Sequence, residues 1–197
     1  MPDPQGQRFD ERELVAQAQA GQLSAFGVLI SQSQERLYGL ALRLTGSADD
    51  AAEVVQETFL RALKSIGHFQ RKARFHTYMV RIMINLVNDM RKRTRREAAH
   101  LALRGSQMLQ QSQAAGMLDP QNPVRSAERR EIADVIHHGL DGLEPHLKQI
   151  MVLREFEQLS YRQIAEIMNV SEGTVKSRLF RAREALRTLL TPYMKMD

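Results

Sequence analysis

Residues 159–183 read LSYRQIAEIMNVSEGTVKSRLFRAR, and this stretch decides the fold of the C-terminal half. Ser160 and Gln163 have the spacing of a capping box, which predicts that a helix begins there. Asn169 is one of the few residues besides glycine that tolerate a left-handed backbone, so it predicts the turn that ends this helix. Ser171 is placed to cap the next helix. The stretch therefore predicts two helices around a tight turn.

The second of these helices combines an apolar stripe with a short, polar and basic outer face. The stripe consists of Val175, Leu179, Ala182 and Leu186. Two helices joined in this way, the second with a polar N-terminal face, form the arrangement that enters a DNA major groove. The outer face supplies candidate DNA contacts: Ser171 at the helix start, Glu172, Thr174, Ser177 and Arg178 for base edges, and Lys176, Arg181 and Arg183 for phosphates. An ordinary helix pair with a solvated basic face is the alternative interpretation.

The rest of the chain predicts a second helical bundle and two irregular segments. Apolar residues recur every three or four positions over 11–97, with breaks at Gly21, Gly46 and Gly67, which predicts four helices in one domain. Residues 1–10 are expected to form a disordered tail, and residues 98–126 a flexible linker. Residues 127–191 are expected to form the C-terminal domain, with about four helices. The predicted fold class is therefore all-α, as two small helical domains joined by a linker.

An acidic helix is predicted in the N-terminal domain, beginning at Ser47. Residues 47–57 contain four acids and no base. Acids near a helix start complement the helix dipole, but this effect fades within a turn, and Glu57 lies beyond it. An acidic face on an otherwise basic protein favours a basic protein surface as its partner.

A basic helix is predicted to follow, beginning near Thr77. Residues 71–96 contain nine Lys or Arg and a single acid, Asp89. One outward line of this helix carries Arg81, Asn85, Asn88, Lys92 and Arg95. Cations that neutralise phosphates release counterions, and Asn side chains can read base edges. This helix is therefore a second candidate DNA-binding element.

Composition narrows the function classes. The chain has 197 residues, a net charge of +5 and no Cys, which excludes disulfides and thiolate chemistry and suits a cytoplasmic location. No segment is predicted to cross a membrane or to act as a secretion signal. Motifs for phosphate cradles, zinc proteases and nucleophile elbows are missing from the sequence, so we expect no enzyme activity, no cofactor, no metal site and no small-molecule substrate.

The sequence also resembles a known family. The runs ADDAAEVVQETFLRAL (48–63) and ARFHTYMVRIMINLVNDMRKR (73–93) resemble region 2 of bacterial RNA polymerase sigma factors, and residues 159–183 resemble their region 4. With only a linker between the two, the chain is similar to the extracytoplasmic-function (ECF) group. Tyr78 stands where most relatives have Trp, and Asn169 replaces the usual turn glycine.

This resemblance implies residue roles and partners. It implies that core RNA polymerase binds Asp49, Glu53, Gln56, Glu57 and Phe59. The downstream promoter element, which is melted at initiation, would contact Arg71, Lys72, Arg74, Thr77, Tyr78, Arg81, Asn85, Asn88, Lys92 and Arg95. The loop at 68–75 would receive a base flipped from the non-template strand, and the helix from Ser171 would read the upstream element. An anti-sigma factor is a further expected partner.

Two other function classes stay open on the sequence alone. The first is a stand-alone helix-turn-helix regulator whose N-terminal domain dimerises or senses a ligand, and which binds a palindromic site by itself. The second is a helical adaptor protein, for which weak, salt-insensitive DNA binding is expected.

Overall fold

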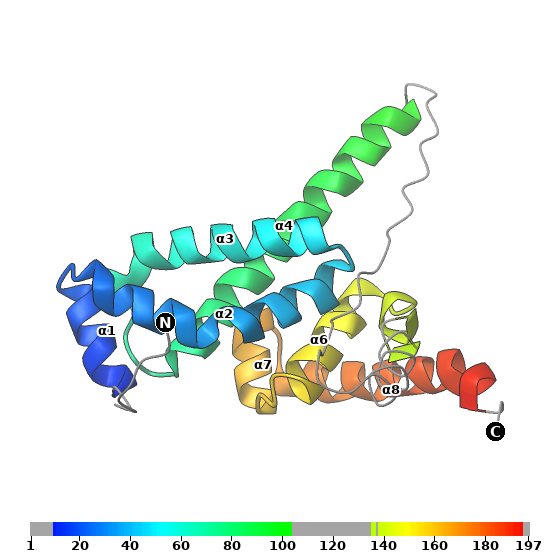
Figure 1. Ribbon diagram of the computed structural model, residues 1–197. Coiled ribbons are helices and arrows are strands. Elements are labelled where there is room, and N and C mark those ends of the chain that lie inside the picture. The colour runs from blue at the N-terminus through cyan, green and yellow to red at the C-terminus, as the bar shows by residue number, and fades with distance from the viewer. Residues whose placement is uncertain (1–9, 104–134, 137, 195–197) are drawn as a thin grey trace, which may run out of the picture.

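The computed structural model describes residues 10–103, 135–136 and 138–194. All regular structure in these ranges is helical, which confirms the predicted all-α class. Their elements are α1 (Glu11–Gln19), α2 (Leu23–Thr45), α3 (Ala48–Ser65), the short 3-10 helix η1 (Ile66–His68), α4 (Phe75–Leu103), α6 (Pro145–Glu155), α7 (Tyr161–Met168) and α8 (Glu172–Met194) (Figure 1). Residues 138–141 are also helical and precede α6.

The N-terminal half is a bundle in which α3 and α4 pack against α2, with α1 across one end (Figure 1). Gly46 ends α2 in the left-handed conformation, at φ 75°, and its N–H donates to the Leu42 carbonyl oxygen. Ser47 then caps α3, because its side chain accepts a hydrogen bond from the Asp50 backbone N–H. The turn between α2 and α3 thus forms where the sequence predicts it.

Three predicted boundaries differ from those in the structure. Asp10, assigned to the tail, caps α1 by accepting from the Arg12 backbone N–H. Helix α4 begins at Phe75 and continues to Leu103, so residues 98–103 of the predicted linker are helical. Residues 97–103, EAAHLAL, contain mostly strong helix formers, which explains why α4 continues beyond the expected end. The remaining linker residues, 104–126, lie outside the described part of the chain.

The predicted helix-turn-helix is present in α7 and α8. Ser160 and Gln163 form a full capping box, and Asn169 adopts the left-handed conformation at φ 52°. Val175, Leu179 and Ala182 are buried against the rest of this half, as the apolar stripe predicts. The local sequence signals therefore set both the start of α7 and the turn to α8.

The left-handed backbone of Asn169 leads to a stability prediction. Asn169→Val should lower the free energy of unfolding by about 1–2 kcal/mol, because a β-branched residue tolerates this conformation poorly. Asn169→Gly should leave stability nearly unchanged. Urea unfolding of both variants checks this, and equal stability of the two would contradict it.

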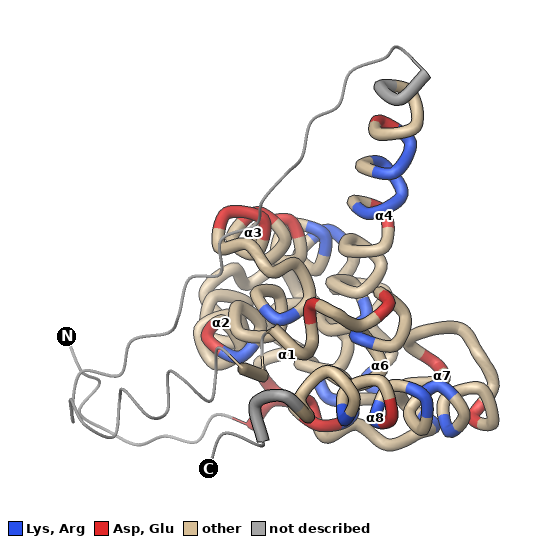
Figure 2. Tube along the Cα trace, turned by 90° about the vertical axis from the view of Figure 1, so that its right-hand side faces the viewer, with Lys and Arg blue, Asp and Glu red and all other residues tan. Residues whose placement is uncertain are grey.

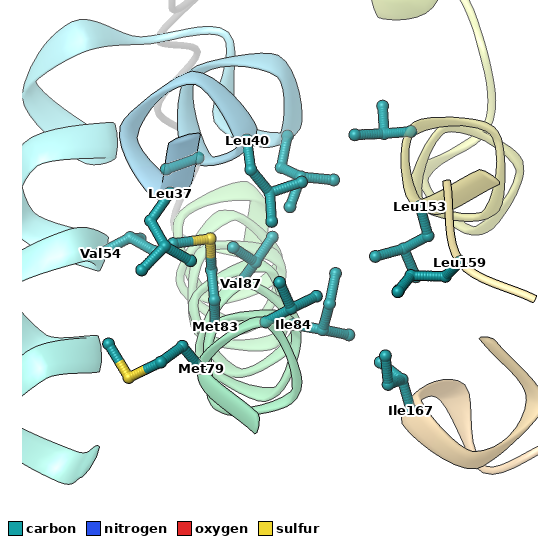
Figure 3. Close-up of a cluster of buried hydrophobic side chains, with 14 of the residues drawn as sticks. Leu37, Leu40, Val54, Met79, Met83, Ile84, Val87, Leu153, Leu159 and Ile167 are labelled. Carbon is teal, nitrogen blue, oxygen red and sulfur yellow. The ribbon is translucent and has the colours of Figure 1, made fainter. Parts of the chain in front are cut away.

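The two halves pack against each other through a continuous apolar core. Helices α6 and α7 contact α2 and α4. Figure 3 shows Ile84 and Val87 of α4 pointing toward Leu153, Leu159 and Ile167 of the C-terminal half. All five side chains are buried, with at most 6% of their surface exposed. The structure thus describes a closed arrangement of the two domains.

Candidate nucleic-acid interface

The basic face of α4 is partly open and partly covered. Arg81, Asn85, Lys92 and Arg95 are exposed, as predicted for DNA contacts. The outer part of α4 extends beyond the bundle and carries a concentration of Lys and Arg (Figures 1 and 2). Asn88, however, is half-buried, and its Oδ1 accepts a hydrogen bond of 2.6 Å from Gln149 Nε2 of α6. The closed arrangement therefore occupies one of the predicted DNA-reading side chains.

Some of the cations around α4 point into the protein. Arg91 donates to the Leu44 carbonyl oxygen at 2.7 Å, and burial lowers its pKa. It therefore joins α4 to the end of α2, although a charge count assigns it to the basic face. Lys92 lies 3.9 Å from Asp89, a contact between exposed side chains that contributes little to stability.

The loop before α4 is cationic and anchored by aromatic rings. Lys72 and Arg74 are exposed, whereas Thr77 and Tyr78 are half-buried. The Tyr78 ring lies 4.7 Å from that of Phe69, centroid to centroid, and its hydroxyl is hydrogen-bonded to Ser65 Oγ. Tyr78 is therefore partly engaged within the protein, which limits the aromatic surface that it can offer a base.

The predicted acidic face lies along α3, where Figure 2 shows Asp and Glu concentrated. Asp49, Glu53 and Gln56 are exposed, Glu57 is half-buried beside Arg61 at 2.7 Å, and Phe59 is half-buried. Tyr38, Val55, Gln56 and Phe59 line part of a groove of about 630 Å³ between α2 and α3. This face therefore joins carboxylates to an apolar depression.

Leu60 and Leu63 extend this face and were missed in the sequence analysis. They are 45% and 37% exposed, so neither is a full core residue. Leu60 lies four residues after Gln56, and Leu63 lies three residues after Leu60. On a helix, these spacings place both leucines beside the acidic face. That spacing could have identified them, and an exposed leucine pair next to carboxylates is typical of a protein-binding surface.

The outer face of α8 has the expected polar and basic character. The Ser171 hydroxyl oxygen accepts from the Thr174 backbone N–H at 3.1 Å and so caps the helix. Glu172, Lys176, Ser177 and Arg181 are exposed, whereas Thr174 and Arg178 are half-buried. This places most of the predicted DNA contacts on one accessible end of the helix.

Two side chains of α8 differ from the sequence interpretation. Arg183 forms an ion pair with Glu155 of α6 at 2.8 Å, and this hydrogen bond raises its pKa. Its guanidinium is therefore engaged within the domain. Phe180 is 68% exposed and belongs neither to the predicted apolar stripe nor to the predicted DNA contacts. An exposed ring on such a helix can pack against a thymine methyl group.

A buried carboxylate joins the two halves. The Glu157 side chain, 3% exposed, has its Oε2 2.9 Å from Arg36 Nε of α2 and 2.8 Å from His76 Nε2 of α4. The Arg43 guanidinium carbon lies 4.4 Å from the Phe156 ring centroid. Burial lowers the pKa of Arg43, while the charge of Glu157 opposes that shift. Polar contacts therefore reinforce the apolar interface between the domains.

Neither a metal site nor a membrane span is found in the part of the chain that the structure describes. In residues 10–103, 135–136 and 138–194, no three His, Asp or Glu side chains are grouped as metal ligands. Over the same ranges, every helix is too short or too polar to span a bilayer.

Comparison with known families matches both halves. The family model described as Sigma-70 region 2 matches residues 29–97, and the model described as Sigma-70, region 4 matches residues 133–186. These ranges contain the acidic face of α3, the basic face of α4 and the helix-turn-helix. The family therefore matches the segments that hold the candidate surfaces.

Relatives that match nearly the whole chain agree with the family models. The RNA polymerase sigma-H factor of Pseudomonas aeruginosa is 34% identical over 187 residues, covering 94% of this chain and 96% of the relative. The ECF RNA polymerase sigma-E factor of Haemophilus influenzae is 34% identical over 188 residues, covering 95% and 99%. The solved structure of CnrH in complex with the cytosolic domain of CnrY has a TM-score of 0.65 at 25% identity, covering 92% of this chain and 97% of that one. The chain therefore belongs to the sigma-70 family of RNA polymerase sigma factors, within its ECF group.

Proposed function

We propose that this chain binds core RNA polymerase and directs it to promoters by reading two separate DNA elements. The acidic face of α3 holds the polymerase, the outer face of α8 reads the upstream element, and α4 with the preceding loop holds the downstream element. The observation that carries this proposal is the separation of one acidic face from two basic faces, all within the two matched family segments. A surface that repels DNA is thus available for a protein partner.

The proposed function depends on non-covalent binding to DNA, and no covalent step is needed. Lys and Arg on α4 neutralise phosphates and release counterions. Contacts to one separated strand offset the cost of unstacking its bases. One acceptor position of the Asn88 amide oxygen is taken by Gln149, so the full use of this side chain for DNA contacts requires α6 to move away from α4. Full engagement of the downstream element therefore requires the two domains to separate.

Partners and location follow from the same proposal. A protein that works with core polymerase acts in the cytoplasm. The structural relative CnrH was solved with the cytosolic domain of CnrY. We infer that an anti-sigma factor likewise binds this chain and covers its polymerase-binding and DNA-binding faces.

DNA binding with and without polymerase separates this function from that of a stand-alone regulator. An asymmetric duplex with both elements should bind tightly only when core polymerase is present. A stand-alone regulator would instead bind a palindromic duplex without polymerase. Tight palindrome binding by the free chain would contradict the proposal.

Arg178 on α8 should contribute to base discrimination. Arg178→Ala should cost about 1–3 kcal/mol of discrimination at one upstream position, the effect of losing a good bidentate base contact. Lys176→Ala, the matched control, should weaken binding uniformly across sequences, as expected for a phosphate contact. Binding assays with single-base variants of the upstream element check this. A uniform loss for Arg178→Ala would assign Arg178 to the phosphates.

A further inference from the structure

Gln19, in the last turn of α1, makes an unusual set of contacts with the loop before α4. Its Nε2 donates to the carbonyl oxygens of Ile66 at 3.0 Å and Phe69 at 2.9 Å. Its Oε1 accepts from Arg71 through Nη2 at 2.5 Å and Nε at 3.2 Å. One amide group thus uses both of its N–H donors and two acceptor positions on η1 and the loop that follows it. These partners lie 47–52 residues away in the chain.

The loop depends on such contacts because it has little internal structure. Residues 69–74 contain neither helix nor strand. Arg71 has φ 57°, a left-handed conformation that a long side chain adopts only where its surroundings hold it. A second contact from α1 fixes the end of the loop, since Glu11 Oε1 accepts from the Phe75 backbone N–H at 3.0 Å. Helix α1 therefore sets the shape of the loop.

The loop that Gln19 holds is suited to an exposed strand of nucleic acid. Gln70, Lys72, Ala73 and Arg74 are all exposed at its tip. Its two ends are joined by Phe69 and Phe75, whose ring centroids are 6.0 Å apart in an edge-to-face contact. The result is a cationic loop of fixed shape whose support comes from a helix outside the candidate DNA-binding residues.

We propose that Gln19 is a positioning residue for base capture: it holds the loop 69–74 in the shape that accepts a base from the separated strand. This rests on the proposed function and on the role that the family resemblance implies for the loop at 68–75, the capture of a base flipped from the non-template strand. Gln19 acts through the Phe69 carbonyl and the Arg71 side chain and makes no base contact of its own. Its loss should affect recognition at one nucleotide and leave polymerase binding intact.

The test uses the complex with core polymerase and single-stranded oligonucleotides that carry the downstream element. Each base is changed in turn, and the affinity is measured. The wild-type complex should prefer one base by about tenfold at the captured position, because a captured base is read by hydrogen bonds to its Watson–Crick edge. Gln19→Leu should reduce that preference to less than about twofold, because a loop of altered shape no longer aligns these hydrogen bonds. Preferences at other positions and binding to an upstream-element duplex should stay unchanged.

Two further variants make the test specific. Gln17→Leu is the control, because Gln17 lies on the same helix and its side chain bonds only to Glu13 among the described contacts, at 3.3 Å. It should retain the preference. Gln19→Glu keeps the acceptor for Arg71 but loses the N–H donors to the two carbonyls. It should therefore lose the base preference, as Gln19→Leu does. If Gln19→Leu fails to fold, the measurement on Gln19→Glu decides the test.

The outcomes separate the two proposals. A retained preference in both Gln19 variants, or an equal loss of affinity at every position, would overturn the positioning role. A wild-type complex with no base preference at any position of the strand would instead overturn base capture by the loop, on which this role rests.

Discussion

Reversing the charge of Glu53 and Glu57 together should abolish stable association with core RNA polymerase. Both carboxylates lie on the acidic face of α3, beside the exposed Leu60. In the proposed complex, this side of α3 contacts a basic surface of the polymerase, and lysines at these positions would face it. Like-charge contacts across an interface cost several kcal/mol. We expect the affinity to fall by at least a hundredfold. Co-elution with core polymerase on a sizing column, followed by a titration, measures this.

The fold should survive these changes. Glu53 is exposed, and Lys is as good a helix former as Glu. At position 57 a lysine would meet Arg61, a like-charge pair that costs only about 0.2–0.5 kcal/mol. Glu13→Lys with Glu166→Lys is the matched control, because it makes the same charge change on exposed helices and also breaks an i,i+4 pair, that of Glu166 with Arg162. Equal polymerase affinity of the two double variants would remove α3 from the interface.

Glu157→Ala should have the largest effect on stability. The substitution removes the carboxylate that accepts from both Arg36 and His76, and it leaves the His76 ring, 15% exposed, without this partner. Losing one member of a buried pair costs about 3–5 kcal/mol. The Arg36 guanidinium is half exposed, so solvent compensates part of that loss, and we expect about 2–3 kcal/mol. Urea unfolding measures this.

The same variant should loosen the contact between the two domains. Hydrogen exchange should increase at the start of α4, at the end of α6 and in the part of α2 around Arg36, while α1 keeps its protection. Glu155→Ala is the control, since Glu155 is 45% exposed and pairs with Arg183 within the C-terminal half. It should cost less than about 1 kcal/mol. Equal losses for the two variants would show that Glu157 does not join the domains as described.

The sequence could predict features that depend on near neighbours in the chain. The capping box at Ser160 and the turn at Asn169 need only residues a few positions away, and both are present in the structure. Gly46 and Ser47 likewise mark the end of α2 and the start of α3. Turns and caps are local, so a single sequence is enough to place them.

The contact between the domains could not be predicted in this way. Gln149 and Glu157 are polar and would be assigned to the surface, yet they are only 3% and 5% exposed. Glu157 is bonded to Arg36, which lies 121 residues away, and periodicity carries no information about such a pairing. Asn88 was predicted to lie on the outer line of its helix, but it is half-buried, because the position of α6 decides what it contacts.

Several candidate DNA contacts likewise depend on tertiary contacts that periodicity and charge do not show. Arg71 and Arg183 are arginines in basic segments, and charge alone assigns both to DNA. In the structure Arg71 is bonded to Gln19, and Arg183 to Glu155. Each contact joins elements that are distant in sequence. A basic run therefore predicts an interface, but the tertiary contacts decide which of its cations remain available to DNA.

Promoter-directed transcription tests the central claim most directly. The purified chain is mixed with bacterial core RNA polymerase and a template that carries one asymmetric promoter with both elements, and the RNA 5′ ends are mapped. We expect RNA to start at one position downstream of that promoter, and expect this start to be lost with Glu53→Lys/Glu57→Lys. RNA starts that are the same with and without the chain would contradict the claim that it is the promoter-reading subunit of the polymerase.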